Sequence, residues 1–334
     1  MVKKFVSIAI PCLLLWGIVP GGAAAQDSYK TVFPFLNLTT AARPAALGGN
    51  QIALFDGQSD LMHINPAYIE PEDHKSISLS YINHLSDINF GFLTTSYHLE
   101  GIGTIGTGIR YASYGEFDKT DAKGEKLGTF QASDIAMNAA ISRNYRGLRY
   151  GASVDLIHSS YEQYNSTAIG LSAGALYELP SGQTHIAAVI KNLGTQLTYY
   201  NGSRESFPFD LLLGASHKPE HLPMRFSVTL QKLNNWDMRS YGEADKPPFA
   251  ELLFRHAILA NEILLGDHVR LRVGYNQYLH DQIQSDSRLN TGGFNFGLGI
   301  EFSRYRFDVS RNSYSDMGGL LQLSIKASLN DARN

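Results

Sequence analysis

Apolar and polar residues alternate through most of the chain after residue 73. In the segment 148–156, alternate positions place Leu, Tyr, Ala, Val and Leu on one face, whereas the other face carries Arg149, Gly151, Ser153 and Asp155. The same split recurs in the segments 269–276, 294–302 and 321–329. Because successive side chains of a β-strand point to opposite faces, each segment is predicted to be a strand with one apolar and one polar face.

About fourteen such segments follow one another, an even number that is typical of single-chain outer-membrane barrels. They begin near His74, Asn89, Gly103, Gln131, Leu148, Thr167, Thr184, Pro208, Met224, His256, His268, Gly293, Arg304 and Leu320. A soluble exported β-protein would alternate as well. Here the polar faces are rich in Gly, Ser, Asn and charges, and many of the 18 Tyr and 17 Phe lie near segment ends. These features favour an all-β fold, a 14-stranded antiparallel transmembrane β-barrel over residues 74–334.

The connections between the segments support the barrel over a sandwich, because short and long connections tend to alternate. Tight turns occur at 100–101, 146–147, 180–182, 266–267 and 303, whereas the predicted long loops are 115–130, 194–207, 236–255 and 281–292. Barrels with periplasmic termini have short inner turns and long outer loops. Two connections break the rule, a short outer one near 85–87 and a long inner one at 217–223. Within 236–255, the pair Pro247-Pro248 predicts a short helix that could cap the outer mouth.

The first residues predict export. Lys3 and Lys4 precede an apolar run, and Ala23-Ala24-Ala25 fits a signal-peptidase site, so residues 1–25 are predicted to be a cleaved signal peptide. The chain has a single cysteine, Cys12, which lies inside this signal, so no disulfide or thiolate site is expected beyond it. A formal net charge of −3 gives no reason to expect binding to nucleic acid.

Residues 26–73 precede the first strand and lack its alternation. We predict that they form a hatch inside the barrel, because small residues such as Ala45, Ala46 and Gly48 can fold compactly there. Arg43 and Asp56 are candidate partners for charges of the wall, and Asn65-Pro66 is expected to turn the chain into the wall. The polar face of the strands predicts these lumen-facing charges: Arg149, Asp155, Arg270, Arg272, Arg304, Arg306 and Asp308.

No motif in the chain indicates catalysis. Gly101, Gly103 and Gly106 match G-x-G-x-x-G, but an alternating strand follows where a dinucleotide site needs a helix. Asp118, Asp121 and Glu125 are interpreted as a solvated acidic loop, with a bound cation as the alternative, because their spacing misses the EF-hand pattern. We therefore expect no enzymatic activity, no metal and no cofactor.

The stretch before the barrel resembles a known family. Its motif consists of Arg43, Pro44, Gly48, Gly49, Asp56, Asn65 and Pro66, and it is similar to the N-terminus of the PorV/PorQ outer-membrane proteins of the type IX secretion system of Bacteroidota. That family is similar in architecture to the FadL fatty-acid transporters, which have a 14-stranded barrel with an N-terminal hatch. The chain's shortness and compact loops look more like the PorQ branch.

The resemblance implies a non-enzymatic protein that anchors the cell-surface attachment complex for secreted cargo. The expected partners are PorZ-like, PorU-like and PorV-like proteins at the outer loops, together with outer-membrane lipids and lipopolysaccharide. A FadL-like transporter of hydrophobic small molecules is the main alternative, and a general diffusion porin is a further one. The lumen-facing charges argue against an apolar lumen, which a fatty-acid transporter would need.

Overall fold

The computed structural model describes residues 31–54, 56, 59–83, 87–238, 246–282, 291–315 and 318–329. Residues Thr31–Asn334 form one compact unit. The predicted signal peptide, residues 1–25, lies outside the described residues. No helix in the described residues is long and apolar enough to cross a membrane.

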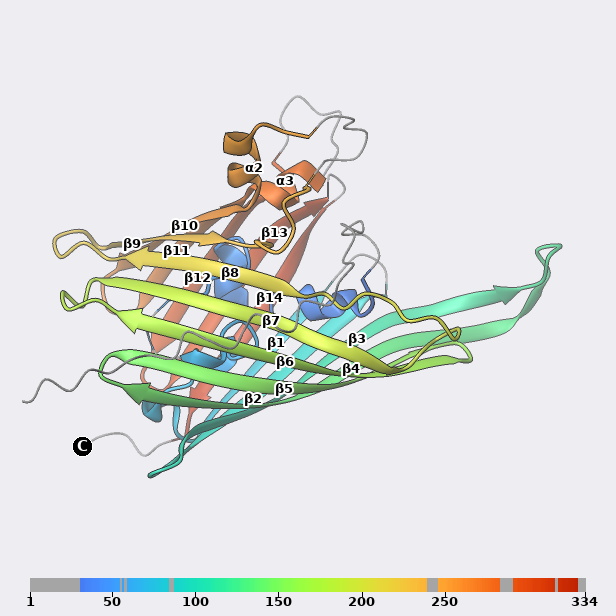
Figure 1. Ribbon diagram of the computed structural model, residues 1–334, viewed down its shortest axis with the longest axis horizontal. Helices are drawn as coiled ribbons and strands as arrows, with labels where there is room; N and C mark the ends of the chain where they lie inside the picture. Colours follow the sequence, from blue (N-terminus) through green and yellow to red (C-terminus); the bar gives the residue numbers. More distant parts are fainter. Residues whose placement is uncertain are drawn as a thin grey trace, which may run out of the picture. The chain divides into compact units, whose positions relative to one another are not determined.

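Fourteen strands in the described part of the chain close into an antiparallel barrel, which confirms the predicted fold (Figure 1). Each strand pairs with its neighbours in sequence, and β1 pairs with β14 to close the ring. The strands are β1 (Ser76–Asn83), β2 (Asn89–Leu99), β3 (Gly103–Thr120), β4 (Lys126–Tyr145), β5 (Leu148–Tyr161), β6 (Tyr164–Glu178), β7 (Thr184–Thr198), β8 (Asp210–His217), β9 (Met224–Leu230), β10 (Ala257–Leu265), β11 (Val269–Asn276), β12 (Phe294–Phe302), β13 (Tyr305–Ser315) and β14 (Gly318–Ser328).

The short helices lie outside the strands. Before β1 come α1 (Ala42–Ala46) and the 3-10 turns η1 (Pro34–Asn37), η2 (Ser59–Leu61), η3 (Pro66–Tyr68) and η4 (Pro71–Asp73). The connection before β10 contains α2 (Phe249–Arg255), which confirms the helix predicted in 236–255, although 239–245 lie outside the described residues. A third helix, α3 (Gln277–Gln282), follows β11. Figure 1 shows α2 and α3 beside each other at one end of the barrel.

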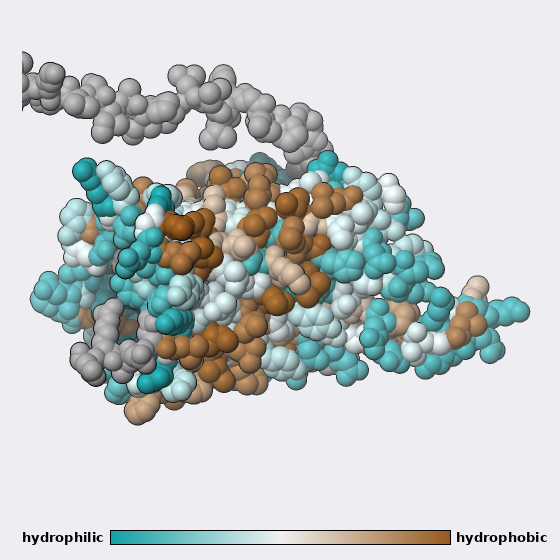
Figure 2. Space-filling view, turned by 90° about the horizontal axis from the view of Figure 1, so that it is seen from below, coloured by the Kyte–Doolittle hydropathy of each residue, from teal (hydrophilic) through white to brown (hydrophobic). Residues whose placement is uncertain are grey.

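The wall is apolar outside and polar inside. Burial alternates along the strands, as in β1, where the serines are buried and Ile77, Leu79 and Tyr81 are exposed. Figure 2 shows hydrophobic residues gathered over the middle of the visible wall and hydrophilic residues toward both ends. This arrangement is that of a wall that faces lipid. We call the end with the tight turns the inner end and the end with α2 and α3 the outer end.

The predicted outer loop 115–130 is wrong, because strands continue through most of it. β3 runs to Thr120 and β4 starts at Lys126, and the two form a hairpin that projects well beyond the barrel (Figure 1). Its tip is the turn around Asp121, and Phe117 stacks on Phe130 with 5.4 Å between ring centroids. The predicted loop 194–207 is also shorter than expected, since β7 continues to Thr198.

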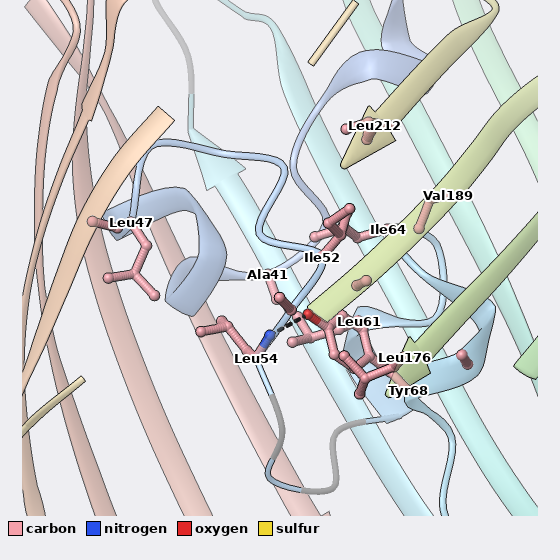
Figure 3. Packing of buried hydrophobic residues seen from close by; sticks show 14 residues of the cluster. Ala41, Leu47, Ile52, Leu54, Leu61, Ile64, Tyr68, Leu176, Val189 and Leu212 are labelled. Atoms are coloured by element: carbon pink, nitrogen blue, oxygen red, sulfur yellow. Dashed lines mark hydrogen bonds between the residues drawn. The ribbon is translucent and has the colours of Figure 1, made fainter. Parts of the chain in front are cut away.

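The segment before β1 fills the interior of the ring, and we call its described residues between 31 and 73 the hatch. Figure 3 shows its apolar side chains packed against the wall, with Leu54, Leu61 and Tyr68 of the hatch close to Leu176 of β6. The hatch also contacts Val189 of β7 and Leu212 of β8 in the same cluster. Because these residues are almost fully buried, their packing is a main source of hatch stability.

The hatch runs through the lumen from the outer end to the inner end. Thr31 forms a parallel β-bridge with Ser206, which lies in the outer connection between β7 and β8. The chain then descends to Pro66, beside Gly151 near the inner end of β5, and enters β1 from there. The prediction of periplasmic termini therefore fits the start of β1 and the end of β14, but the described chain itself begins at the outer end.

Candidate functional site

Arg43 of α1 joins the hatch to the wall near the inner end of the lumen. Its Nη1 and Nη2 atoms donate to the two carboxylate oxygens of Asp56 at 2.9 and 2.7 Å. Its Nε and Nη2 atoms also donate to Glu262 of β10 at 3.0 and 2.7 Å. Arg43 is 2% exposed, so one buried guanidinium binds two carboxylates in the paired geometry that is strong for arginine.

Two further arginines of the wall share these carboxylates. Arg225 of β9 donates to Asp56 at 2.9 Å and to Glu262 at 3.0 Å, and Arg272 of β11 donates to Glu262 at 2.7 Å. Burial acts to raise the pKa of the Asp56 carboxyl. The Arg225 and Arg43 guanidinium groups outweigh this effect and hold the pKa well below its usual range. Asp56 is therefore charged at neutral pH and binds its arginines as a carboxylate.

The ion pairs continue along the wall to a second part of the hatch. Arg272 donates to Asp308 of β13 at 2.6 Å, and Arg306 donates to the same carboxylate at 2.8 Å. Arg306 also donates to Asp60 of the hatch at 2.9 Å. Four arginines and four carboxylates thus form one network, which comprises Arg43, Arg225, Arg272, Arg306, Asp56, Asp60, Glu262 and Asp308. The balance of charge explains how so many ions can lie together when all but Asp56 are largely buried.

The sequence prediction found part of this network. Arg43, Asp56, Arg272, Arg306 and Asp308 come together in it. It missed Glu262 and Arg225, although both occupy polar positions of otherwise apolar strands, so the alternation could have indicated them. It also missed Asp60, which lies in the hatch and has no strand period to reveal it.

The other predicted charges lie elsewhere. Arg149 is buried and pairs with Glu70 of the hatch, and Asp155 accepts from Arg110 at 2.6 Å higher in the lumen. Arg270 donates instead to the backbone carbonyls of the inner turn at 266–269. Arg304 lies exposed in the turn between β12 and β13, where it lines the inner mouth of the lumen.

Asn65 and Pro66 act within the hatch. Asn65 caps η3 by accepting from the Ala67 amide at 3.0 Å, and its side-chain amide donates to the Ile52 carbonyl at 3.0 Å. The Tyr68 hydroxyl accepts from the Leu54 amide at 2.7 Å (Figure 3). The same hydroxyl donates to the Gln51 carbonyl, also at 2.7 Å. These bonds satisfy buried polar groups that the barrel wall does not reach.

Close contact between hatch and wall requires glycine at two wall positions. A Cβ at Gly274 of β11 would lie 2.1 Å from the Leu47 carbonyl carbon, and a Cβ at Gly174 of β6 would lie 2.0 Å from Asn65 Oδ1. No side chain fits at such distances. The hatch residues Gly48 and Gly49 have φ values of 89° and 113°, which L-residues rarely adopt, and there the chain turns out of α1. Pro44 is buried within α1.

The outer half of the lumen is lined mainly by aromatic and aliphatic side chains. Phe33 of the hatch packs against Tyr200 and Phe207 of the outer connection, with ring centroids 6.3 and 5.9 Å apart. Tyr161 links this group to Tyr114 at 5.7 Å. The surrounding cluster includes further buried apolar residues of the hatch and the wall, among them Val32, Phe35, Leu36, Phe90, Phe92 and Ile157. The lumen therefore has a mainly apolar outer compartment, which also contains the Arg110–Asp155 pair and Asp134, above an ionic inner compartment.

Asp118 and Asp121 of the β3–β4 hairpin bind neighbours within the hairpin. Asp118 pairs with Lys126 at 2.5 Å, and Asp121 Oδ1 accepts from the amides of Lys123 and Glu125 at 2.8 and 2.9 Å. Among the described residues, no group of three or more His, Cys, Asp or Glu side chains is arranged to hold a metal ion.

Several solved structures have a fold similar to that of this chain. No family model and no curated protein matches the sequence. A TodX deltaS2S3 mutant monoaromatic hydrocarbon channel matches with a TM-score of 0.54 and 14% identity over 87% of this chain and 99% of that chain. The CymD monoaromatic hydrocarbon channel matches with a TM-score of 0.53 and 14% identity over 89% and 99%. A Pseudomonas aeruginosa FadL homologue matches with a TM-score of 0.50 and 10% identity over 90% and 100%. The chain thus has the FadL-like outer-membrane barrel fold.

Proposed function

We propose that the protein is a gated outer-membrane barrel that takes up hydrophobic small molecules. The observation that carries this proposal is the aromatic outer compartment, where Phe33, Tyr200 and Phe207 meet under the outer mouth. Apolar surroundings with a few polar groups suit small apolar ligands. Two of the structures with a similar fold are described as monoaromatic hydrocarbon channels, which supports the same ligand class.

In this proposal, the ion pairs between the hatch and the wall in the inner compartment form the gate of the barrel. A ligand in the outer compartment lies beside Phe33 at the outer end of the hatch, and the hatch below it is tied to the wall through Arg43 and Arg306. Passage toward the inner end therefore requires the hatch to shift. The charged lumen, which argues against a permanently apolar channel, is in this proposal the closed state of the gate.

Uptake into proteoliposomes tests this function directly. Radiolabelled toluene and a long-chain fatty acid are the probes, because they represent the two hydrophobic classes. We expect uptake above that of empty vesicles, and a lower uptake for the double variant Tyr200→Ala/Phe207→Ala. The control variant Phe117→Ala lies on the exposed hairpin and should behave as the unmodified protein does. Uptake equal to that of empty vesicles for both probes would contradict the proposal.

A second candidate function is an anchor of the type IX surface-attachment complex, as the resemblance to PorV/PorQ implies. The observation that favours it is the β3–β4 hairpin, which projects past the other strands at the outer end. Beyond Ser113 in β3 and before Ala132 in β4, the two strands pair only with each other among the described residues. Such a two-stranded ribbon offers free edges to a protein partner.

Pull-down from solubilised outer membranes tests the anchor. The full chain and a variant that lacks residues 115–130 would be compared, with heat-modifiable migration on gels to verify barrel assembly. Recovery of PorZ-like or PorU-like proteins with the full chain alone would support the anchor. If neither chain recovers such partners, the anchor function is wrong. The loops 194–207, 236–255 and 281–292 remain further candidate contacts.

A further inference from the structure

Arg311 of β13 stands on the outside of the barrel, where the wall is otherwise apolar. Among the described outward-facing residues of β11 to β14, it is the only charged side chain. Its partners in the ladder are Phe296 and Leu321, which are 53% and 47% exposed. The ladder therefore places a cation between apolar side chains that face lipid.

The Arg311 guanidinium has no acceptor in the described part of the protein. The side chain lies over Gly319 of β14, where a Cβ would be 3.1 Å from Arg311 Cγ and 3.2 Å from its Nε. A guanidinium carries five donors and cannot lose its charge. Charged residues in contact with hydrocarbon are costly unless an anion or water meets them. No acceptor among the described residues meets this charge, so a group of the surrounding membrane can bind it.

Arg311 lies in the outer part of the wall. β13 leaves the inner turn at Tyr305 and ends at Ser315, and Arg311 is nearer to Ser315. A side chain at this height reaches toward the outer leaflet and its headgroups.

An apolar hollow adjoins Arg311 on the same outer surface. Its volume is about 450 Å³, within the range of roughly 300–1,000 Å³ that ligand sites occupy. Leu298 and Val309 are half-buried and face each other across the ladder. The remaining outward-facing side chains that line it are Leu271, Phe296, Leu321 and Arg311. The hollow thus offers an apolar surface with a cation beside it, which matches the two ends of a lipid.

The hollow is closed behind by the hatch. A Cβ at Gly297, which also lines the hollow, would lie only 2.4 Å from Ala46 Cβ of α1. The neighbouring Arg272 is held by Glu262 and Asp308 at 2.7 and 2.6 Å. No free space is left there between the wall and the hatch. An occupant therefore comes from the bilayer and not from the lumen.

We propose that this hollow binds an anionic lipid of the outer membrane. An acyl chain lies over Leu298 and Val309, and a phosphate oxygen of the headgroup accepts hydrogen bonds from Arg311. Arginine and phosphate are matched in geometry, and their hydrogen bonds are stronger than those between neutral groups. The inference needs only that the apolar wall lies in a membrane, so it stands or falls separately from the proposed uptake function.

Native mass spectrometry of the full chain in neutral detergent tests the site. Equal amounts of phosphatidylglycerol and phosphatidylcholine are offered, and we expect the phosphatidylglycerol adduct to dominate. Arg311→Gln should lower the preference for phosphatidylglycerol about tenfold, because a hydrogen bond to a charged group is lost. Leu298→Trp fills the hollow and should lower both adducts. Leu213→Trp, at an outward position of β8, is the matched control and should change neither.

A crosslinking measurement needs no variant. Phosphatidylglycerol with a photoreactive acyl chain should label peptides of β11 to β14 in the unmodified protein. A parallel arm with bisphosphorylated lipid A asks which source is used: stronger competition by lipid A indicates the outer-leaflet glycolipid, and weaker competition indicates a phospholipid. The proposal is overturned if the labels map to other strands, or if Arg311→Gln keeps the full preference for phosphatidylglycerol.

Discussion

Arg43 illustrates how much of the closed state depends on single residues of the hatch. It binds Asp56 of the hatch and Glu262 of the wall through one guanidinium. Glu262 keeps Arg225 and Arg272 when Arg43 is removed, so the wall carboxylate would still be neutralised. Loss of Arg43 is therefore expected to weaken the attachment of the hatch, which keeps its pairs to Arg225 and Arg306, without leaving a bare charge in the wall.

The variant Arg43→Gln tests this expectation about the attachment of the hatch. We expect it to weaken the attachment of the hatch by about 1.5–3 kcal/mol, the range for hydrogen bonds to charged groups. Conductance in planar bilayers should then show more frequent openings than the unmodified barrel does. Arg304→Gln changes an exposed arginine of the inner turn and serves as the control. Equal conductance of the two variants would contradict the role given to Arg43.

Gly274 carries a second prediction at this scale. Its missing Cβ leaves room for the backbone at Leu47, so Gly274→Ala should displace the hatch while the barrel still assembles. Limited proteolysis should then cut the hatch faster, with heat-modifiable migration unchanged. Gly91→Ala is the matched control, because nothing lies within 4 Å of a Cβ there. Protection of the hatch equal to that in the control would show that the contact is not needed.

Sequence reasoning reached some of these residues and could not reach others. Arg272 and Asp308 were found because the strand period places them inside the lumen. The bonds of Arg43 to Glu262 could not be predicted, because they join residues far apart in the chain and depend on the fold of the hatch. Gly174 and Gly274 looked like ordinary polar-face residues, since their role depends on what packs against them.

At the scale of the strand, alternation is informative only where one face meets lipid. It predicted β5, β11 and β12 closely. It failed for the hairpin of β3 and β4, because both faces of a ribbon beyond the membrane are wet and charged residues can occupy either one. The glycines and charges of 115–130 therefore suggested a loop, although the backbone ladder continues through most of the range.

Leu323 of β14 tests which face meets lipid. It is 48% exposed on the outward row. Leu323→Arg should destabilise the barrel by roughly 2–4 kcal/mol if the residue lies near the middle of the bilayer. Urea unfolding in lipid vesicles, followed by tryptophan fluorescence, measures the change. The conservative variant Leu323→Ile is the control, and a similar unfolding midpoint for both would show that this face does not meet hydrocarbon.

At the scale of the whole molecule, the hatch crosses the lumen from one end to the other. The sequence predicted a hatch before the first strand but could not give its direction, because nothing in residues 26–73 indicates where it begins. The bridge between Thr31 and Ser206 supplies that direction. The hatch is thus held at the outer end by backbone pairing and at the inner end by ion pairs.

A disulfide tests this direction. The mature chain is predicted to lack cysteine, so Thr31→Cys/Ser206→Cys introduces a single possible pair. We expect it to oxidise readily, because bridge partners lie within the distance that a disulfide spans. Thr31→Cys/Ser303→Cys places the second thiol in an inner turn and should remain reduced. Gel migration with and without reductant distinguishes the two, and oxidation of the inner pair instead would reverse the direction.

The projecting hairpin also affects the solubility of the chain during its export to the membrane. Among the described residues, barrel closure removes most free strand edges, but those of this long ribbon remain, and its backbone could pair with that of another copy. Its outer part carries many ions, among them Glu116, Asp118, Lys119 and Lys126. Like charges of two copies would repel when their edges meet in register. We infer that these ions protect the ribbon from fibre-like self-association, so that their removal would affect solubility during export before it affected the folded barrel.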